Sequence, residues 1–105
     1  MVKAAIAKKL LKYRDLLKQK GLPVEGMLLF GSQVSGKSGS ESDIDVCIIL
    51  SRPEGNRIQE GKRLHLLALQ IDPRIEPVFF SRKQYQEDKI SPLLHEIRKN
   101  GIKLS

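Results

Sequence analysis

Residues 29–46 read LFGSQVSGKSGSESDIDV, and this stretch decides the fold that the sequence predicts. An apolar run ends at Gly31-Ser32, a loop rich in Gly and Ser follows, and a second apolar run begins around Asp43-Ile44-Asp45. Because side chains alternate along a strand, Asp43 and Asp45 would share one face about 6–7 Å apart while Ile44 packs into the core. The stretch therefore predicts two strands joined by a loop, with a pair of carboxylates at the entrance to the second strand.

The flanking patterns predict an α/β (α+β) fold in which helices flank a small mixed sheet. The β-branched run Ile44–Leu50 is typical of a central strand, and Pro77 confines the third strand to an edge or an irregular position. Ser81 to Gln84 has the spacing of a capping box, and Ser91-Pro92 opens a last helix. We expect helices over residues 3–19 and 58–71, strands over 24–30, 44–50 and 74–80, a helical turn from 81 and a helix over 92–100.

Length and composition restrict the class of protein. The 105 residues are enough for one compact domain, 1–105, and 40% of them are hydrophobic. Cys47 is the single cysteine, so a disulfide framework is excluded, and its place in the strand predicts a small buried hydrophobe. No run approaches the length of a membrane span or of a signal peptide. We expect a cytoplasmic protein.

The net charge of +7 conceals an uneven distribution. Residues 1–20 carry seven basic groups and one acidic group, and residues 82–105 carry six and three. The middle of the chain, residues 21–81, carries six basic groups and eight acidic ones. Basic ends suggest a nucleic-acid binder, but no aromatic RNA-binding pattern or DNA-reading helix accompanies them, so this function is the least favoured.

The loop also satisfies the phosphate-loop pattern of nucleoside triphosphatases, from Gly31 to Ser38. That mechanism needs a helix beginning at Lys37-Ser38, whereas Gly39 to Asp43 form helices poorly and a strand follows almost at once. A P-loop type NTPase is therefore a lesser alternative.

The carboxylates support a different chemistry. Asp43 and Asp45 could share divalent cations, and Mg²⁺ commonly takes one or two carboxylates alongside substrate phosphates. Glu76, inside the third strand, is the best candidate for a third acid. As alternatives, Asp43 could serve only as a turn residue, and Glu76 could simply pair with Arg74 or Lys62 at a sheet edge.

With these residues the chain resembles the minimal nucleotidyltransferases of the DNA polymerase beta superfamily. The resemblance rests on Leu29-Phe30-Gly31-Ser32, Gly36 and Ser42-Asp43-Ile44-Asp45-Val46, with Glu76 as the third acid. It implies transfer of a nucleoside monophosphate, AMP from ATP, to an acceptor hydroxyl on a protein. It also implies that Gly31 and Ser32 hold the β- and γ-phosphates, that Asp43 and Asp45 bind two Mg²⁺ ions, and that Glu76 helps to deprotonate the acceptor. The chain has Gln33-Val34-Ser35 where the family often has two arginines, and Lys37 would compensate for the missing charge.

The resemblance further implies a small helical partner of the HEPN class, with this chain as the antitoxin of a HEPN toxin. Exposed leucines on the terminal helices would suit such a partner. The alternative is a catalytically weak nucleotide-binding antitoxin or regulatory subunit that acts by contact. We expect His65 and His95, which have no partner at metal-ligand spacing, to play structural or surface roles.

Overall fold

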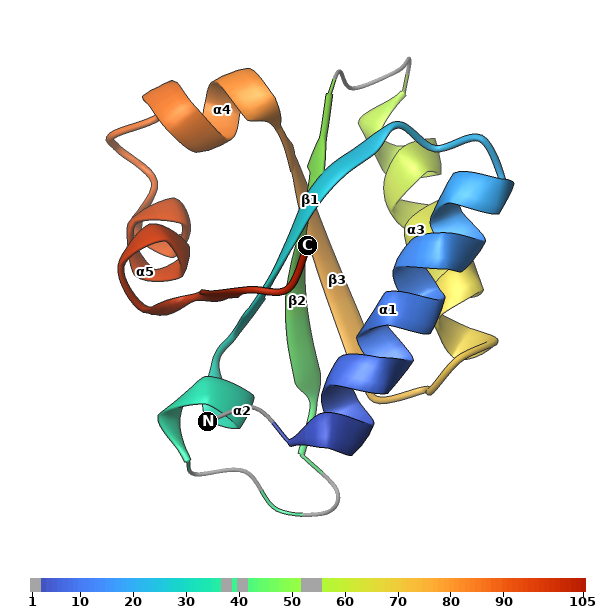
Figure 1. Ribbon diagram of the computed structural model, residues 1–105. Helices are drawn as coiled ribbons and strands as arrows, with labels where there is room; N and C mark the ends of the chain where they lie inside the picture. Colours follow the sequence, from blue (N-terminus) through green and yellow to red (C-terminus); the bar gives the residue numbers. More distant parts are fainter. Residues whose placement is uncertain (1–2, 37–38, 40–41, 52–55) are drawn as a thin grey trace.

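The computed structural model describes residues 3–36, 39, 42–51 and 56–105, and a four-stranded mixed sheet forms its centre (Figure 1). The strands follow the order β3-β2-β1-β4. Their bounds are Val24–Phe30 for β1, Ile44–Leu50 for β2, Ile75–Ser81 for β3 and Ile102–Lys103 for β4. β1 pairs antiparallel with β2 and β4, and β2 pairs parallel with β3. The predicted mixed sheet is confirmed: β2 lies inside it, and β3, which contains Pro77, is an edge strand.

Helices cover both faces of this sheet (Figure 1). One layer consists of α1 (Ala4–Gln19) and α3 (Arg57–Leu69), and the other of α4 (Arg82–Glu87) and α5 (Pro92–Asn100). A single turn of helix, α2 (Ser32–Ser35), follows β1 directly. The long predicted helices agree with the structure to within one or two residues, whereas α2 and the short β4 were not predicted.

Local sequence explains where the helices begin and end. The Asn56 side chain accepts hydrogen bonds from the Ile58 and Gln59 amides at the start of α3. The predicted capping box of Ser81 and Gln84 is present at α4, and Ser91 caps α5. These caps fix where the three helices begin, and α4 begins directly after β3.

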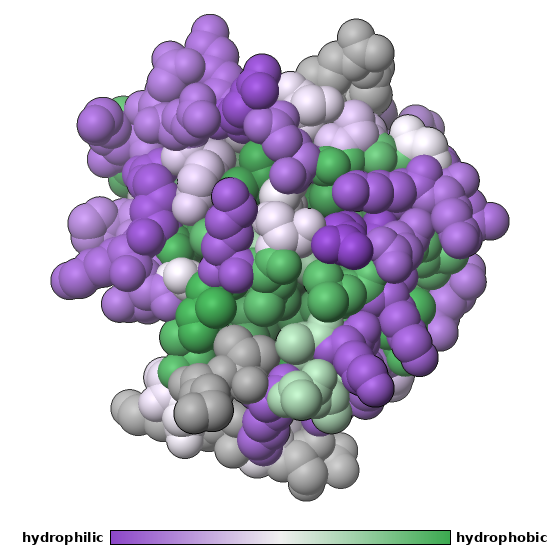
Figure 2. All heavy atoms as spheres, in the orientation of Figure 1, coloured by the Kyte–Doolittle hydropathy of each residue, from purple (hydrophilic) through white to green (hydrophobic). Residues whose placement is uncertain are grey.

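The main hydrophobic core lies between the sheet and the layer of α1 and α3. Alternate side chains of β1 and β2 point to opposite faces, so Leu29 and Ile48 join this core while Leu28 and Cys47 join a smaller cluster beneath α4 and α5. Tyr13 is fully buried, and its hydroxyl donates to the Leu64 carbonyl at 2.8 Å. Figure 2 shows hydrophilic side chains over the two helical layers and hydrophobic ones gathered over the strands between them.

Large apolar side chains remain exposed mainly on α3. Ile58, Leu66 and Leu69 are 71%, 64% and 53% exposed, whereas Leu93 on α5 is 39% exposed. The expectation of exposed leucines on both terminal helices is therefore wrong for α1, whose apolar stripe turns toward the core. No helix among the described residues is long and apolar enough to cross a membrane.

Asp72 joins the two helices of the main layer to the sheet. Its carboxylate accepts a hydrogen bond from Lys9 Nζ on α1 at 2.6 Å and from the Arg74 amide and guanidinium just before β3 at 2.8 and 3.0 Å. The bond from the Arg74 guanidinium, with help from Lys9, holds the pKa of Asp72 well below its usual range. These bonds fix the point at which β3 enters the sheet beside β2.

We expect Asp72→Asn to lower the free energy of unfolding by about 2 kcal/mol at pH 7, because two charge-assisted contacts lose their charge. A depressed carboxyl pKa contributes stability above the unfolded-state pKa of about 3.9, and the contribution is lost as the pH falls below it. In urea denaturation, the difference in the free energy of unfolding between wild type and Asp72→Asn should therefore narrow as the pH falls from about 5 to about 2. Asp15→Asn, at an exposed pair with Arg14, is the control. A difference that is independent of pH would contradict this account.

Candidate functional site

Asp45 lies where three strand-end segments meet. In the sheet register it stands opposite Phe30 of β1 on one side and Glu76 of β3 on the other. Phe30 leads directly into Gly31, whose φ of 76° belongs to the region that favours glycine. A methyl group at Gly31 would collide with Oδ2 of Asp45. The chain therefore brings the Gly31 backbone close to the Asp45 carboxylate.

The environment of Asp45 disfavours its negative charge. Burial is the largest cause of a raised pKa, and the neighbouring carboxylates of Asp43 and Glu76 raise it further. Ile44, between the two aspartates, is fully buried in the main core, as the alternation of the strand predicts. Asp43 and Glu76 therefore both act on Asp45 at the entrance of β2, and a cation placed beside Asp45 would relieve the repulsion.

Gln33 connects α2 to this entrance and was missed as a site residue in the sequence. Its side chain is only 8% exposed, and its Nε2 donates to the backbone carbonyl of Asp43 at 3.2 Å. The bond crosses the loop between β1 and β2 and holds Asp43 next to α2. In the sequence, Gln33 stands out only because related proteins often have an arginine there. The burial of its amide could not be predicted, because a single buried amide gives no periodic signal.

Glu76 occupies the predicted position, but its carboxylate also has a partner that the sequence did not suggest. Its Oε2 lies 3.9 Å from Nε2 of His65 on α3, and both side chains are about half exposed. The suggested partner Arg74 bonds Asp72. His65 is therefore a neighbour of the acidic site, a role that its place on an apolar helix did not indicate.

The acidic site offers few side chains of its own to a Mg²⁺ ion. Within the described ranges, no three His, Cys, Asp or Glu side chains are gathered so that they could hold a metal ion by themselves. Mg²⁺ commonly needs only one or two carboxylates when substrate phosphates and water supply the other oxygens. Asp45, which lies beside Gly31, and the nearby Asp43 fit that requirement, with Glu76 as an additional acid.

The phosphate-loop alternative does not fit the fold. β1 pairs antiparallel with β2, whereas a phosphate loop leads from a strand into a long helix that crosses to a parallel strand. The turn of helix that does follow β1 begins at Ser32 and ends at Gly36. Lys37, the predicted phosphate contact, lies outside the described residues.

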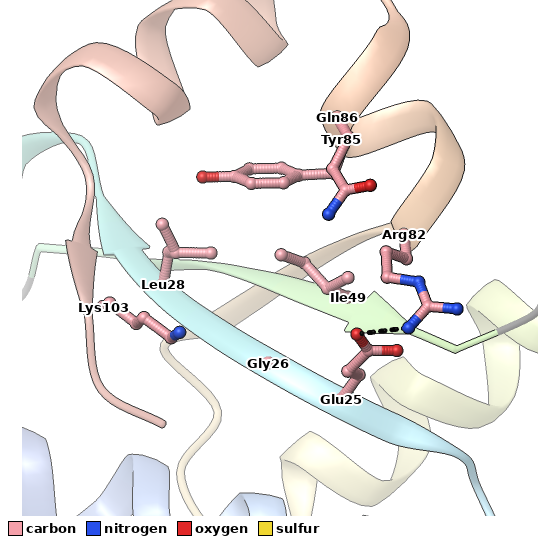
Figure 3. Close-up of a pocket in the computed structure, with 8 residues that line it drawn as sticks. All are labelled: Glu25, Gly26, Leu28, Ile49, Arg82, Tyr85, Gln86 and Lys103. Atoms are coloured by element: carbon pink, nitrogen blue, oxygen red, sulfur yellow. Dashed lines mark hydrogen bonds and ion pairs between the residues drawn. The ribbon is translucent and has the colours of Figure 1, made fainter.

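A second pocket lies on the same face of the sheet, toward the other end of the strands (Figure 3). It has a volume of about 220 Å³. Leu28 and Ile49 form its floor beneath the ring of Tyr85, and an ion pair of 3.1 Å joins Arg82 to Glu25 at its side. It contains none of the three candidate acids, so the carboxylate site and this pocket are separate.

We expect Gly31→Ala to displace the Asp45 carboxylate and to weaken binding of Mg·ATP at least about tenfold, measured by calorimetry. Gly36→Ala is a matched control, because Gly36 also has a positive φ, of 80°, but among the described residues other than its chain neighbours no atom lies within 4 Å of an added methyl group. Both variants should lose about 1–2 kcal/mol of stability from backbone strain. Equal loss of binding in the two variants would show that strain, and not the contact with Asp45, is responsible.

The raised pKa of Asp45 gives a second prediction. The Asp45 carboxyl has a higher pKa in the folded protein than the value of about 3.9 in the unfolded chain. As the pH rises through these two pKa values, ionisation of this carboxyl lowers the free energy of unfolding. In metal-free buffer at pH 7, Asp45→Asn should therefore melt at a higher temperature than the wild type, and the difference should shrink below about pH 4. Glu87→Gln, an exposed acid on α4, should leave the melting temperature unchanged. A lower melting temperature for Asp45→Asn at pH 7 would contradict the prediction.

Comparison with known proteins agrees with this geometry. Residues 10–99 match the nucleotidyltransferase domain family. No curated protein sequence matches the chain. Among solved structures, a toxin–antitoxin complex with AMP-PNP is similar, with a TM-score of 0.65 and 23% identity over 94% of this chain and 72% of that one.

Two further structures share the fold. The toxin–antitoxin MntA-HepT has a TM-score of 0.60 and 20% identity over 98% of this chain and 72% of that one. A putative nucleotidyltransferase from Sulfolobus solfataricus has a TM-score of 0.63 and 15% identity over 94% and 78%. At these identities the likeness shows the fold alone. The family match extends over most of the chain and includes the Gly31-Ser32 turn and the three acids, so the chain belongs to the nucleotidyltransferase domain family.

Proposed function

We propose that this nucleotidyltransferase transfers AMP from ATP to a hydroxyl group of a partner protein, with Mg²⁺ as cofactor. The observation that carries the proposal is the position of Asp45, which contacts Gly31 and stands opposite Glu76. Phosphate groups held by the Gly31 and Ser32 backbone would lie directly against the carboxylate pair. A bound Mg²⁺ supplies charge neutralisation at the reacting phosphate and orients the nucleophile.

In the proposed reaction, the acceptor hydroxyl oxygen forms a bond to the α-phosphorus while the bond from the α-phosphorus to the α,β-bridging oxygen breaks and pyrophosphate leaves. The hydroxyl proton passes to a carboxylate, for which Glu76 is the candidate because its half-exposed side chain stands beside Asp45 at the sheet edge. Asp43 and Asp45 would hold the cofactor, and Gly31 and Ser32 would hold the leaving phosphates. Gln33 keeps Asp43 in place by donating a hydrogen bond to the backbone carbonyl of Asp43.

The partner that we propose is a small helical protein of the HEPN class, with this chain as its antitoxin in the cytoplasm. Two of the similar structures are toxin–antitoxin complexes by their own description, which supports this choice. On this chain the exposed Ile58, Leu66 and Leu69 of α3 offer apolar contact area. The same helix carries His65 beside Glu76, so a partner seated there would lie next to the acidic site.

Two labels test the reaction. With ATP labelled at the α-phosphate and Mg²⁺, we expect a co-expressed HEPN partner to become labelled, whereas ATP labelled at the γ-phosphate should leave it unlabelled. Asp45→Asn should reduce the α-label at least about a hundredfold, and Glu87→Gln should not change it.

The outcomes separate the alternatives. Transfer of the γ-label would indicate a kinase reaction and would contradict the proposal. If the partner stays unlabelled but binds wild type and Asp45→Asn with equal affinity, the enzyme hypothesis fails. The alternative, a catalytically weak antitoxin that acts by contact, then holds.

A further inference from the structure

A pocket of about 360 Å³ lies between α2 and α5, lined by Gly31, Val34, Ser35, Glu96 and Asn100. Gly31 belongs both to this pocket and to the carboxylate site, because it also contacts Asp45. A ligand whose phosphates lie at Gly31 can therefore continue into the pocket. Glu96 and Asn100 come from the far end of the sequence and were not expected near the site.

The polar side chains of this pocket offer hydrogen-bond acceptors. Asn100 Nδ2 donates to Glu96 Oε1 at 3.0 Å, and the Ser35 hydroxyl donates to the Ser32 carbonyl at 3.3 Å. These bonds engage the Ser35 hydroxyl hydrogen and one amide hydrogen of Asn100. The carboxylate of Glu96 and the amide oxygen of Asn100 accept hydrogen bonds. The bond between Glu96 and Asn100 joins side chains four residues apart on α5, so the two oxygens are held as one unit.

This wall is unsuited to phosphate and suited to a neutral group that donates hydrogen bonds. A carboxylate repels the negatively charged triphosphate. The nucleoside part of the same ligand carries donors, namely the ribose hydroxyls and, in adenine, an amino group. The ribose is joined to the α-phosphate through its 5′ methylene group and an ester oxygen, so it is the part of the nucleoside that lies closest to the α-phosphate, which the proposed function puts at Asp45 beside Gly31.

We propose that the pocket between α2 and α5 binds the nucleoside of the triphosphate through its hydrogen-bond donors, with Glu96 and Asn100 accepting from the ribose hydroxyls. The proposal rests on the proposed function, since it takes the phosphates to lie at Gly31. In this proposal Glu96 determines nucleotide specificity. The site selects ribonucleotides over nucleotides whose sugar lacks the 2′-hydroxyl.

Calorimetry with four Mg²⁺ complexes tests this inference: ATP, 2′-deoxy-ATP, ITP, which lacks the amino group of adenine, and inorganic tripolyphosphate. Wild type should bind ATP and ITP more tightly than 2′-deoxy-ATP, and tripolyphosphate should bind through the phosphate site alone. Glu96→Ala should weaken ATP binding about ten- to a hundredfold and remove the preference over 2′-deoxy-ATP, because a hydrogen bond to a charged group is lost. Its affinity for tripolyphosphate should be unchanged or higher.

Glu87→Ala is the matched control, because it removes the same charge from an exposed helical position outside the pocket. Glu96 and Asn100 are also exposed, so their substitution should leave the melting temperature within about 2 °C of wild type. Asn100→Ala, which frees the Glu96 side chain, should give a smaller loss of the same kind. If ITP alone binds weakly, the base amino group is the donor and the ribose assignment is wrong.

Two results overturn the inference. If Glu96→Ala binds ATP as tightly as wild type, the nucleoside lies elsewhere, while the proposed function stands as long as ATP and tripolyphosphate still bind. If Glu96→Ala loses ATP and tripolyphosphate equally, Glu96 supports the phosphate site and not a nucleoside pocket. Wild type that binds none of the four complexes would instead refute the proposed function itself.

Discussion

The structure depends on keeping the Asp45 carboxylate within the inner strand of the sheet. An acid in such a strand costs free energy unless its charge is compensated, and the raised pKa of Asp45 expresses that cost. The surrounding segments increase the cost, because Asp43 lies just before the strand and Glu76 stands opposite Asp45 on β3. Two segments far apart in the sequence therefore bring negative charge close to Asp45, which is expected of a site that receives cations and not of a sheet selected for stability alone.

The rest of the fold makes this arrangement possible by separating the functions of the two sheet faces. The face toward α1 and α3 carries the main core, and the fully buried Ile44 belongs to it. The opposite face is only partly filled, with a small apolar cluster beneath α4 and α5, two pockets and the acidic site at the end where β2 begins. The larger core therefore lies on one face, and the other face carries the pockets and the acidic site.

Much of this organisation could be predicted from the sequence because it depends on short-range patterns. Periodic leucines, the caps at Ser81 and Ser91 and the β-branched run from Ile44 predicted the long elements and the central strand that contains Asp45. What could not be predicted depends on contacts across the chain. The bond of Gln33 to the Asp43 carbonyl, the approach of His65 to Glu76 and the place of Glu96 near Gly31 join residues whose spacing carries no periodic signal. The single turn α2 was missed because four residues are too few to show a helical pattern.

The most direct measurement of the central claim is a crystal structure of the chain with Mn²⁺ and the α,β-methylene analogue of ATP, in which anomalous scattering locates the metal. The account predicts a Mn²⁺ ion bound by Asp43 and Asp45, with the triphosphate against the Gly31-Ser32 backbone. A nucleotide bound in the pocket beside Tyr85 and Arg82, with no metal at the two aspartates, would contradict it.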